Sequence, residues 1–217
     1  MVKTRYTRTS NAARHLPPTC LIFVLVVLFF TCPYSLFTPV YAQETADTSL
    51  NRGSFSLVDH NGRAVTQQNF RGSYLLVFFG YTHCPDICPT ALTLIANVMD
   101  SLGENSKSVQ PIFITLDPER DTPEVLRKFV SYFHPKLIGL TGTPDQVSTV
   151  AKSYFVRYQR YSPESSHSTL NNKEELDYFL DHTAASYLLG PSAEGMALFQ
   201  HGTSAAEMVA KIRSVME

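Results

Sequence analysis

The chain has 217 residues, a formal net charge of -1 and an ordinary hydrophobic content of 44%. This length suits one compact domain of ~100–200 residues with additional segments. A nearly balanced charge argues against nucleic acid as a partner, and the lack of any long acidic run argues against a disordered acidic tail. We find no internal repeat and no heptad pattern in the sequence.

The first 42 residues have the layout of a secretory signal. An apolar run covers residues 20–30, and Val40 and Ala42 provide a small-residue cleavage pattern. The alternative is an uncleaved membrane anchor, but the strict apolar run is shorter than a span of ~20 residues. Pro33 and Pro39 interrupt its extension. The basic residues that precede the first acidic one are Lys3, Arg5, Arg8 and Arg14.

Residues 1–42 are therefore interpreted as a signal peptide or membrane anchor, and residues 43–53 as a polar linker. Both forms of the leader place the domain at residues 54–217 across a membrane. We expect the bacterial periplasm or cell envelope, with the domain soluble or anchored facing outward, in preference to the mitochondrial inner membrane. Cys20 and Cys32 lie in the leader and are interpreted as apolar filler.

The domain begins with strand signals. Alternation at residues 55–59 followed by Asn61-Gly62 predicts a β-hairpin. Continuous apolar runs at residues 74–79 and 111–117 predict strands that are buried on both faces, and residues 137–140 predict a third, short strand.

Helix signals alternate with these strands. One helix is expected after the cysteine segment, and Thr122-Pro123-Glu124 and Thr143-Pro144-Asp145 each predict a capped helix start. Residues 159–177 are polar and predict a long excursion with little structure. A hairpin at residues 185–199 and a capping box from Ser204 to Glu207 complete the chain.

The predicted order is a hairpin, then β-α-β-α-β-α, then a second hairpin and a last helix. Alternating strands and helices indicate a parallel sheet with covered faces, to which the second hairpin adds antiparallel strands. This order resembles the α/β thioredoxin-like fold with an extra N-terminal β-hairpin.

The two cysteines of the domain, Cys84 and Cys88, lie between a buried strand and a helix. α/β sheets place their sites at such turns, and a helix N-terminus favours thiolate over thiol. At positions i and i+4 of a helix the Cβ atoms are ~5–6 Å apart, which is wide for a disulfide, with its Cβ separation of ~3.5–4.5 Å. The spacing favours a bridging metal, while a plain disulfide or a redox pair stays an alternative.

His182 is the candidate third ligand. It precedes the late hairpin, where a thioredoxin-like fold brings the chain opposite the cysteine turn, and no proline occurs between Pro163 and Pro191. Two thiolates and one imidazole suit one copper ion per chain, as Cu(I) or Cu(II), whereas structural zinc normally has four ligands. His83 is the alternative to His182.

Three motifs resemble the Sco/SenC family of copper-binding, thioredoxin-like proteins that assist cytochrome c oxidase assembly. They are Gly80-Tyr-Thr-His-Cys-Pro-Asp-Ile-Cys-Pro-Thr90, Leu116-Asp-Pro-Glu-Arg-Asp-Thr-Pro-Glu124 and Asp181-His-Thr-Ala-Ala-Ser-Tyr187. The resemblance extends from about Gly53 to the C-terminus.

The resemblance implies that Cys84, Cys88 and His182 are copper ligands. It also implies that copper passes to the binuclear centre of cytochrome c oxidase subunit II, from an upstream donor that the sequence does not identify. A thiol-disulfide oxidoreductase that reduces the cysteines of that centre, with Cys84 and Cys88 forming a disulfide, is the alternative. Asp117 and Asp121 match an acidic pair near the family's site, although Asp121 could instead be an outer contact at a helix N-terminus.

Overall fold

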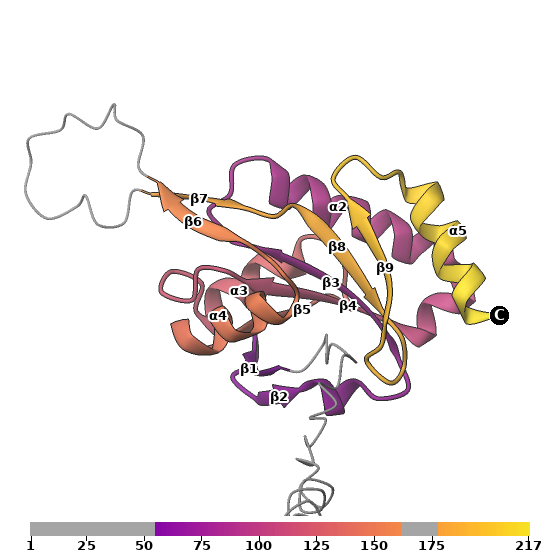
Figure 1. The fold of residues 1–217 in the computed structure, drawn as a ribbon, viewed down its shortest axis with the longest axis horizontal. Coiled ribbons are helices and arrows are strands. Elements are labelled where there is room, and N and C mark those ends of the chain that lie inside the picture. Colours follow the sequence, from indigo (N-terminus) through magenta and orange to yellow (C-terminus); the bar gives the residue numbers. More distant parts are fainter. Residues whose placement is uncertain (1–54, 162–177) are drawn as a thin grey trace, which may run out of the picture. The chain divides into compact units, whose positions relative to one another are not determined.

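The computed structural model describes residues 55–161 and 178–217 (Figure 1). The expected leader at 1–42, the linker at 43–53 and most of the 159–177 excursion lie outside these residues. Within the described residues, no helix combines the length and the apolar character that a membrane span requires.

The domain alternates strands and helices along the chain. The strands are β1 (Ser56–Asp59), β2 (Ala64–Thr66), β3 (Tyr74–Gly80), β4 (Val109–Thr115), β5 (Ile138–Thr141), β6 (Tyr158–Tyr161), β7 (Phe179–His182), β8 (Ala185–Leu189) and β9 (Gly195–Gln200). The α-helices are α2 (Ile87–Leu102), α3 (Pro123–Ser131), α4 (Pro144–Ser153) and α5 (Ala205–Met216), and the 3-10 helices are η1 (Gln67–Phe70) and η2 (Gly103–Ser108).

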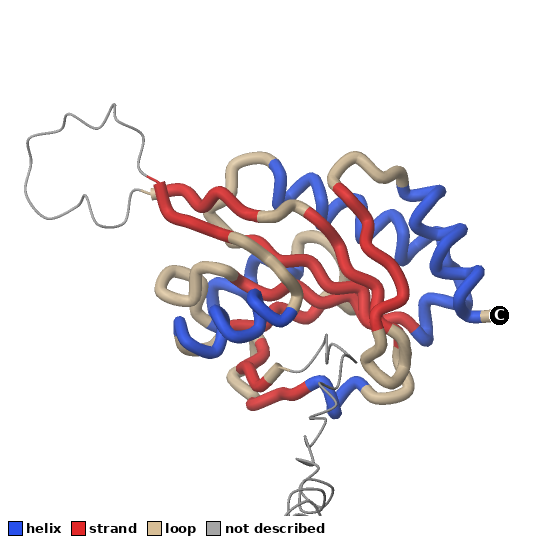
Figure 2. Tube along the Cα trace, in the orientation of Figure 1, coloured by secondary structure: helices blue, strands red, loops and turns tan. Residues whose placement is uncertain are grey.

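Seven of these strands form one sheet in the order β2-β1-β5-β4-β3-β8-β9. Strands β3, β4 and β5 are parallel, β8 pairs antiparallel with β3, and β9 pairs antiparallel with β8. The first two strands pair as the predicted N-terminal hairpin across Asn61-Gly62. Figure 2 shows this twisted layer of strands with the helices around it.

Both faces of the sheet are covered by helices. On one face Phe113 of β4 packs against Phe129 of α3, with ring centroids 5.5 Å apart, and Cys88 of α2 lies over β3. On the other face the ring of Tyr154, at the end of α4, lies 5.0 Å from that of Phe79. Runs that are apolar at every position, such as β3, are therefore buried on both sides.

Three of the predicted helix starts are confirmed, whereas α2 begins at Ile87, within the cysteine segment and not after it. Thr122, Thr143 and Ser204 are N-caps whose side-chain oxygens accept hydrogen bonds from backbone N–H groups of the first turn. The caps of α4 and α5 also form reciprocal capping boxes with Gln146 and Glu207.

The prediction of little structure from residue 159 is wrong at its start. Strand β6 pairs antiparallel with β7 in a separate two-stranded ribbon, with Tyr158 opposite His182 and Tyr161 opposite Phe179. Three of the four residues of β6 are exposed, so its sequence has the polar character of a loop. Cross-strand contacts, including the 5.8 Å ring contact of Tyr161 with Phe179, stabilise it instead.

Gly80, the last residue of β3, marks the closest approach of the sheet to α2. A Cβ atom built there would lie 2.7 Å from the Cys88 Sγ and 3.0 Å from the Phe113 ring. No side chain fits under these contacts unless the helix or the ring moves, so glycine lets Cys88 sit directly on the sheet.

We expect Gly80→Ala to lower the free energy of unfolding by about 1–3 kcal/mol, because it overpacks the core beneath α2. Urea unfolding of the reduced protein measures this loss. The double variant Gly80→Ala/Cys88→Ala should cost less than the sum of the two single changes, because the nearest clashing atom is gone. Strict additivity would show that the Cys88 contact is not the source of the strain.

Candidate metal centre

The two cysteines occupy different structural environments. Helix α2 begins at Ile87, so Cys88 lies in its first turn and Cys84 precedes the helix. The helical i, i+4 geometry that gave the expected Cβ separation therefore does not apply to this pair. Instead the chain folds back, so that the backbone N–H of Cys88 donates to the Cys84 Sγ over 3.4 Å. Cys88 is fully buried and Cys84 is partly exposed.

His182 ends β7 and faces the cysteines from the other side. Its Nε2 lies 3.5 Å from the Cys88 Sγ. Its Nδ1 lies 3.1 Å from the carbonyl oxygen of Thr183. Nε2 is therefore the ring nitrogen that faces the cysteine pair. The rings of Phe78 and Tyr81 meet the imidazole edge-on, at 6.3 and 6.0 Å.

Cys84, Cys88 and His182 together form a compact donor set. One potential ligand atom from each residue lies within 4.8 Å of the others. In the part of the chain that the structure describes, this is the one group of three or more such residues close enough to hold a metal ion. Two soft sulfurs and an imidazole match the preferences of copper, so the residues present fit that ion.

The alternative ligand His83 is directed elsewhere. Its Nδ1 lies 3.1 Å from the hydroxyl of Thr82 and 4.0 Å from a carboxylate oxygen of Asp121, and its side chain is 54% exposed. It is not part of the compact donor set.

The two thiols have opposite acidities. A hydrogen bond from the Cys88 thiol, aided by His182 and the Cys88 backbone N–H, lowers the pKa of Cys84 to about 3 against the effect of burial. The same hydrogen bond and its own burial raise the pKa of Cys88. The metal-free site thus holds one thiolate, Cys84, and one thiol, Cys88, which donates its hydrogen bond to Cys84.

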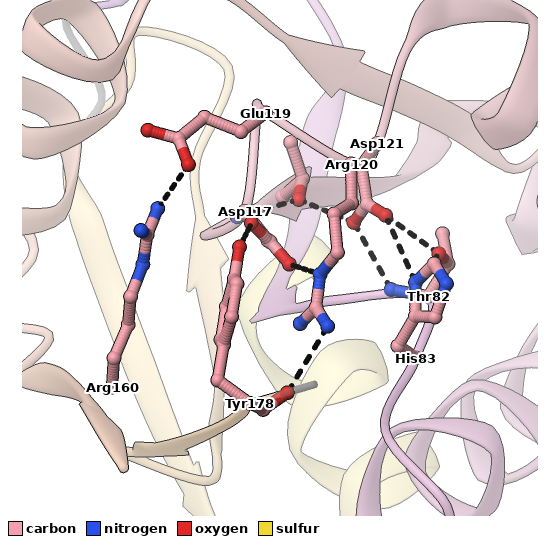
Figure 3. Close-up of polar contacts among 9 residues, drawn as sticks. Thr82, His83, Asp117, Glu119, Arg120, Asp121, Arg160 and Tyr178 are labelled. Carbon is pink, nitrogen blue, oxygen red and sulfur yellow. Dashed lines mark hydrogen bonds and ion pairs between the residues drawn. The ribbon is translucent and has the colours of Figure 1, made fainter. Parts of the chain in front are cut away.

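Asp121 holds the segment of chain that leads to Cys84. It is fully buried and accepts three hydrogen bonds, from the Thr82 backbone N–H at 3.0 Å, the Thr82 hydroxyl at 2.6 Å and the Thr115 hydroxyl at 2.6 Å (Figure 3). Burial raises the pKa of Asp121, and these hydrogen bonds oppose the rise. The alternative of an outer contact at a helix N-terminus is wrong, because Thr122 caps α3 and Asp121 points inward.

Asp117 is equally buried but contacts residues on the side of the site that carries His182. It accepts a 2.5 Å hydrogen bond from the Tyr178 hydroxyl and pairs with Arg120 (Figure 3). Neither aspartate belongs to the donor set. Sequence reasoning missed Thr82, Arg120 and Tyr178. The available signal was the acidic pair itself, since buried carboxylates require partners.

A cleft of about 590 Å³ gives access to this centre. Cys84 and His182 line it, whereas the deeper Cys88 does not. Much of the remaining wall is apolar and comes from the turn before α2 and from the ribbon, through Tyr81, Pro85, Ile87, Tyr161 and Phe179. Cys84 is therefore the sulfur that an approaching ion or protein meets first.

We expect Cys84 to react with iodoacetamide at a nearly constant rate between about pH 5 and pH 8, because a thiol with a pKa of about 3 is already deprotonated there. An ordinary thiol would accelerate about tenfold per pH unit. Mass spectrometry of the alkylated peptides at each pH measures the rate. In Cys88→Ala the largest stabilising contact is lost, and steep pH dependence should return. A steep profile in the unchanged protein would contradict the assignment.

Comparison with known proteins supports this description of the fold. A family model described as SCO1/SenC matches residues 43–217. The crystal structure of Arabidopsis thaliana ScoI with copper bound is 37% identical, with a TM-score of 0.66, over 76% of this chain and 97% of that one. The predicted α/β, thioredoxin-like fold class is thereby confirmed.

Two curated relatives show the same similarity in sequence. A mitochondrial SCO1 homologue of Arabidopsis thaliana is 44% identical over 140 residues, which are 64% of this chain and 39% of the relative. A SCO2-like protein of Rickettsia prowazekii is 38% identical over 157 residues, 72% of this chain and 73% of the relative. The chain thus matches only about two fifths of the Arabidopsis relative's length. The family match covers most of the chain, and the protein belongs to the SCO1/SenC family.

Proposed function

We propose that this protein binds one copper ion through Cys84, Cys88 and His182 and delivers it during assembly of the binuclear copper centre of cytochrome c oxidase. The observation that carries the proposal is the compact donor set, which brings together Cys88 and His182 from positions 94 residues apart. The copper-bound state of the similar Arabidopsis structure supports the choice of ion.

The acidities of the two thiols suit reversible loading. The Cys84 thiolate lines the open cleft and offers an incoming cation a charged first ligand. Cys88 keeps its proton until a cation competes for the sulfur, so binding releases that proton and is weakened at low pH. The Nε2 of His182 faces the sulfurs and completes a three-coordinate site. Such a site leaves room for a ligand from a receiving protein.

The receiving protein in this proposal is cytochrome c oxidase subunit II, and the upstream copper donor is unassigned. The proposed compartment is the bacterial periplasm or cell envelope, which the domain reaches through the leader at residues 1–42 with residues 43–53 as a linker. The relatives include a mitochondrial plant protein and a protein from a bacterium, so the family occurs in mitochondria and in bacteria.

A second candidate function is reduction of a partner's disulfide, which the thiolate-thiol pair at Cys84 and Cys88 favours. The Cys84 thiolate would attack the partner disulfide and form a mixed disulfide, releasing one partner thiolate. Cys88 would then lose its proton and displace the second partner sulfur. The product is a Cys84–Cys88 disulfide, and the partner gains two electrons.

Copper titration of the reduced protein tests the primary proposal. We expect one equivalent of Cu(I) or Cu(II) per chain, with an intense thiolate-to-Cu(II) charge-transfer band in the absorption spectrum. Absence of binding, with the cysteines oxidising to a disulfide, would favour the reductase instead.

Ligand variants separate the roles of the three residues. We expect Cys88→Ser to lose tight binding of both Cu(I) and Cu(II), because the soft thiolate sulfurs contribute most to the binding of each ion. His182→Ala should weaken Cu(II) binding by at least about tenfold more than Cu(I) binding, because imidazole matters more to the harder ion. Competition titrations measure both affinities. His83→Ala is the matched control and should behave as the unchanged protein. Unaltered Cu(II) affinity in His182→Ala would contradict the ligand assignment.

A further inference from the structure

His182 is carried by an element that stands apart from the main sheet. The seven-stranded sheet holds β3, which leads into the cysteine turn, whereas among the described strands β6 and β7 pair only with each other. Figure 1 shows this ribbon projecting from the domain. Pairing within the ribbon fixes its two strands to one another and does not by itself place His182 opposite Cys88. The imidazole therefore depends on the contacts that join the ribbon to the domain.

Several of these contacts are made by Tyr178, the residue before β7. It is 7% exposed, its hydroxyl donates to Asp117 over 2.5 Å, and its carbonyl accepts a 3.0 Å hydrogen bond from the Arg120 Nη1. Its ring also lies 3.7 Å from the guanidinium carbon of Arg120. Side chain and backbone of one residue are thus held at the same point, four positions before His182.

Asp117 and Arg120 form a rigid partner for this residue. Their side chains pair with each other and are only 1% and 6% exposed. A buried guanidinium has donors in a fixed plane, so its geometry tolerates little displacement of the groups it bonds. The exposed Arg160 of β6 reaches Glu119 of the same loop over 2.6 Å and adds a weaker, solvent-screened contact.

The same loop also holds the cysteine half of the site. Asp121 bonds both the backbone and the side chain of Thr82, two residues before Cys84 (Figure 3). Residues 117–121 are therefore a common anchor. One end fixes the turn that carries the sulfurs, and the other end fixes the strand that carries the imidazole.

We propose that Asp117, Arg120 and Tyr178 form a positioning cluster that sets the place of His182 relative to the two sulfurs and so sets the preference of the site for Cu(II) over Cu(I). None of the three belongs to the donor set, so they act through the backbone of β7. This inference rests on the proposed function for the identity of the ligands, but the placement of the imidazole can be tested without metal.

The test is Tyr178→Phe, which removes the hydroxyl and keeps the ring against Arg120. We expect Cu(II) affinity to fall about tenfold and Cu(I) affinity to change less than about twofold, because Cu(I) is held mainly by sulfur. Arg120→Lys, which keeps the charge but not the planar fork, should act in the same direction. The control is Tyr132→Phe, the same change at a ring that is 84% exposed and outside the cleft, and it should alter neither affinity.

Two readouts distinguish positioning from a general loss of structure. In a His182→Ala background, Tyr178→Phe should have no further effect on Cu(II) affinity, since the group that it positions is absent. In the metal-free protein, NMR resonances of the His182 ring nitrogens should shift in Tyr178→Phe and stay in place in Tyr132→Phe. Urea unfolding of each variant reports whether the fold is retained.

Three results would overturn the cluster's role. They are equal losses of Cu(I) and Cu(II) affinity, an additive loss in the His182→Ala background, and an unshifted His182 ring in both Tyr178→Phe and Arg120→Lys. Failure of the unchanged protein to bind copper would instead overturn the proposed function. In that case the ring resonances of the metal-free variants still decide whether the cluster positions His182.

Discussion

Two buried carboxylates on the loop between β4 and α3 are the constraint on which the site depends. Removing a carboxylate from water is costly unless hydrogen bonds or a cation replace the lost solvation. Asp121 obtains its partners from the turn before Cys84, and Asp117 obtains its partners from Arg120 and from the start of β7. Satisfying these two groups therefore brings together segments that are distant in sequence.

The chemistry of the cysteine pair follows from a similar asymmetry. Cys84 lies before α2, where it accepts hydrogen bonds and faces the cleft, whereas Cys88 lies inside the first turn and is buried against Gly80. The three residues between them produce this difference, because they fold Cys84 back onto the helix start. Cys84 is thus a thiolate that can bind a cation or attack a disulfide, and Cys88 is a thiol that keeps its proton.

The sequence predicted the elements whose patterns are local. The apolar runs of β3 and β4, the caps at Thr122 and Thr143, and the three candidate ligands were each visible in a short segment. It did not predict β6, because an exposed strand that is stabilised by its neighbour has no apolar periodicity. Nor did it predict the contact of Tyr178 with Asp117, since the two residues are 61 positions apart and neither one specifies its partner locally.

The sulfurs and the imidazole are held by different parts of the fold, and this affects how the site can discriminate between Cu(I) and Cu(II). The sulfurs are held against the core of the main sheet. At Gly80, beneath Cys88, even one added methyl group would clash with neighbouring atoms. The imidazole is held by a ribbon outside that sheet, through hydrogen bonds around Tyr178 and through its ring contacts with Phe78 and Tyr81. In the proposed function, the ligand that matters more to Cu(II) is therefore carried outside the main sheet. A receiving protein that disturbs the ribbon would, in that function, weaken Cu(II) binding while the two sulfurs stay in place, and release would follow from a small local movement rather than from unfolding of the domain.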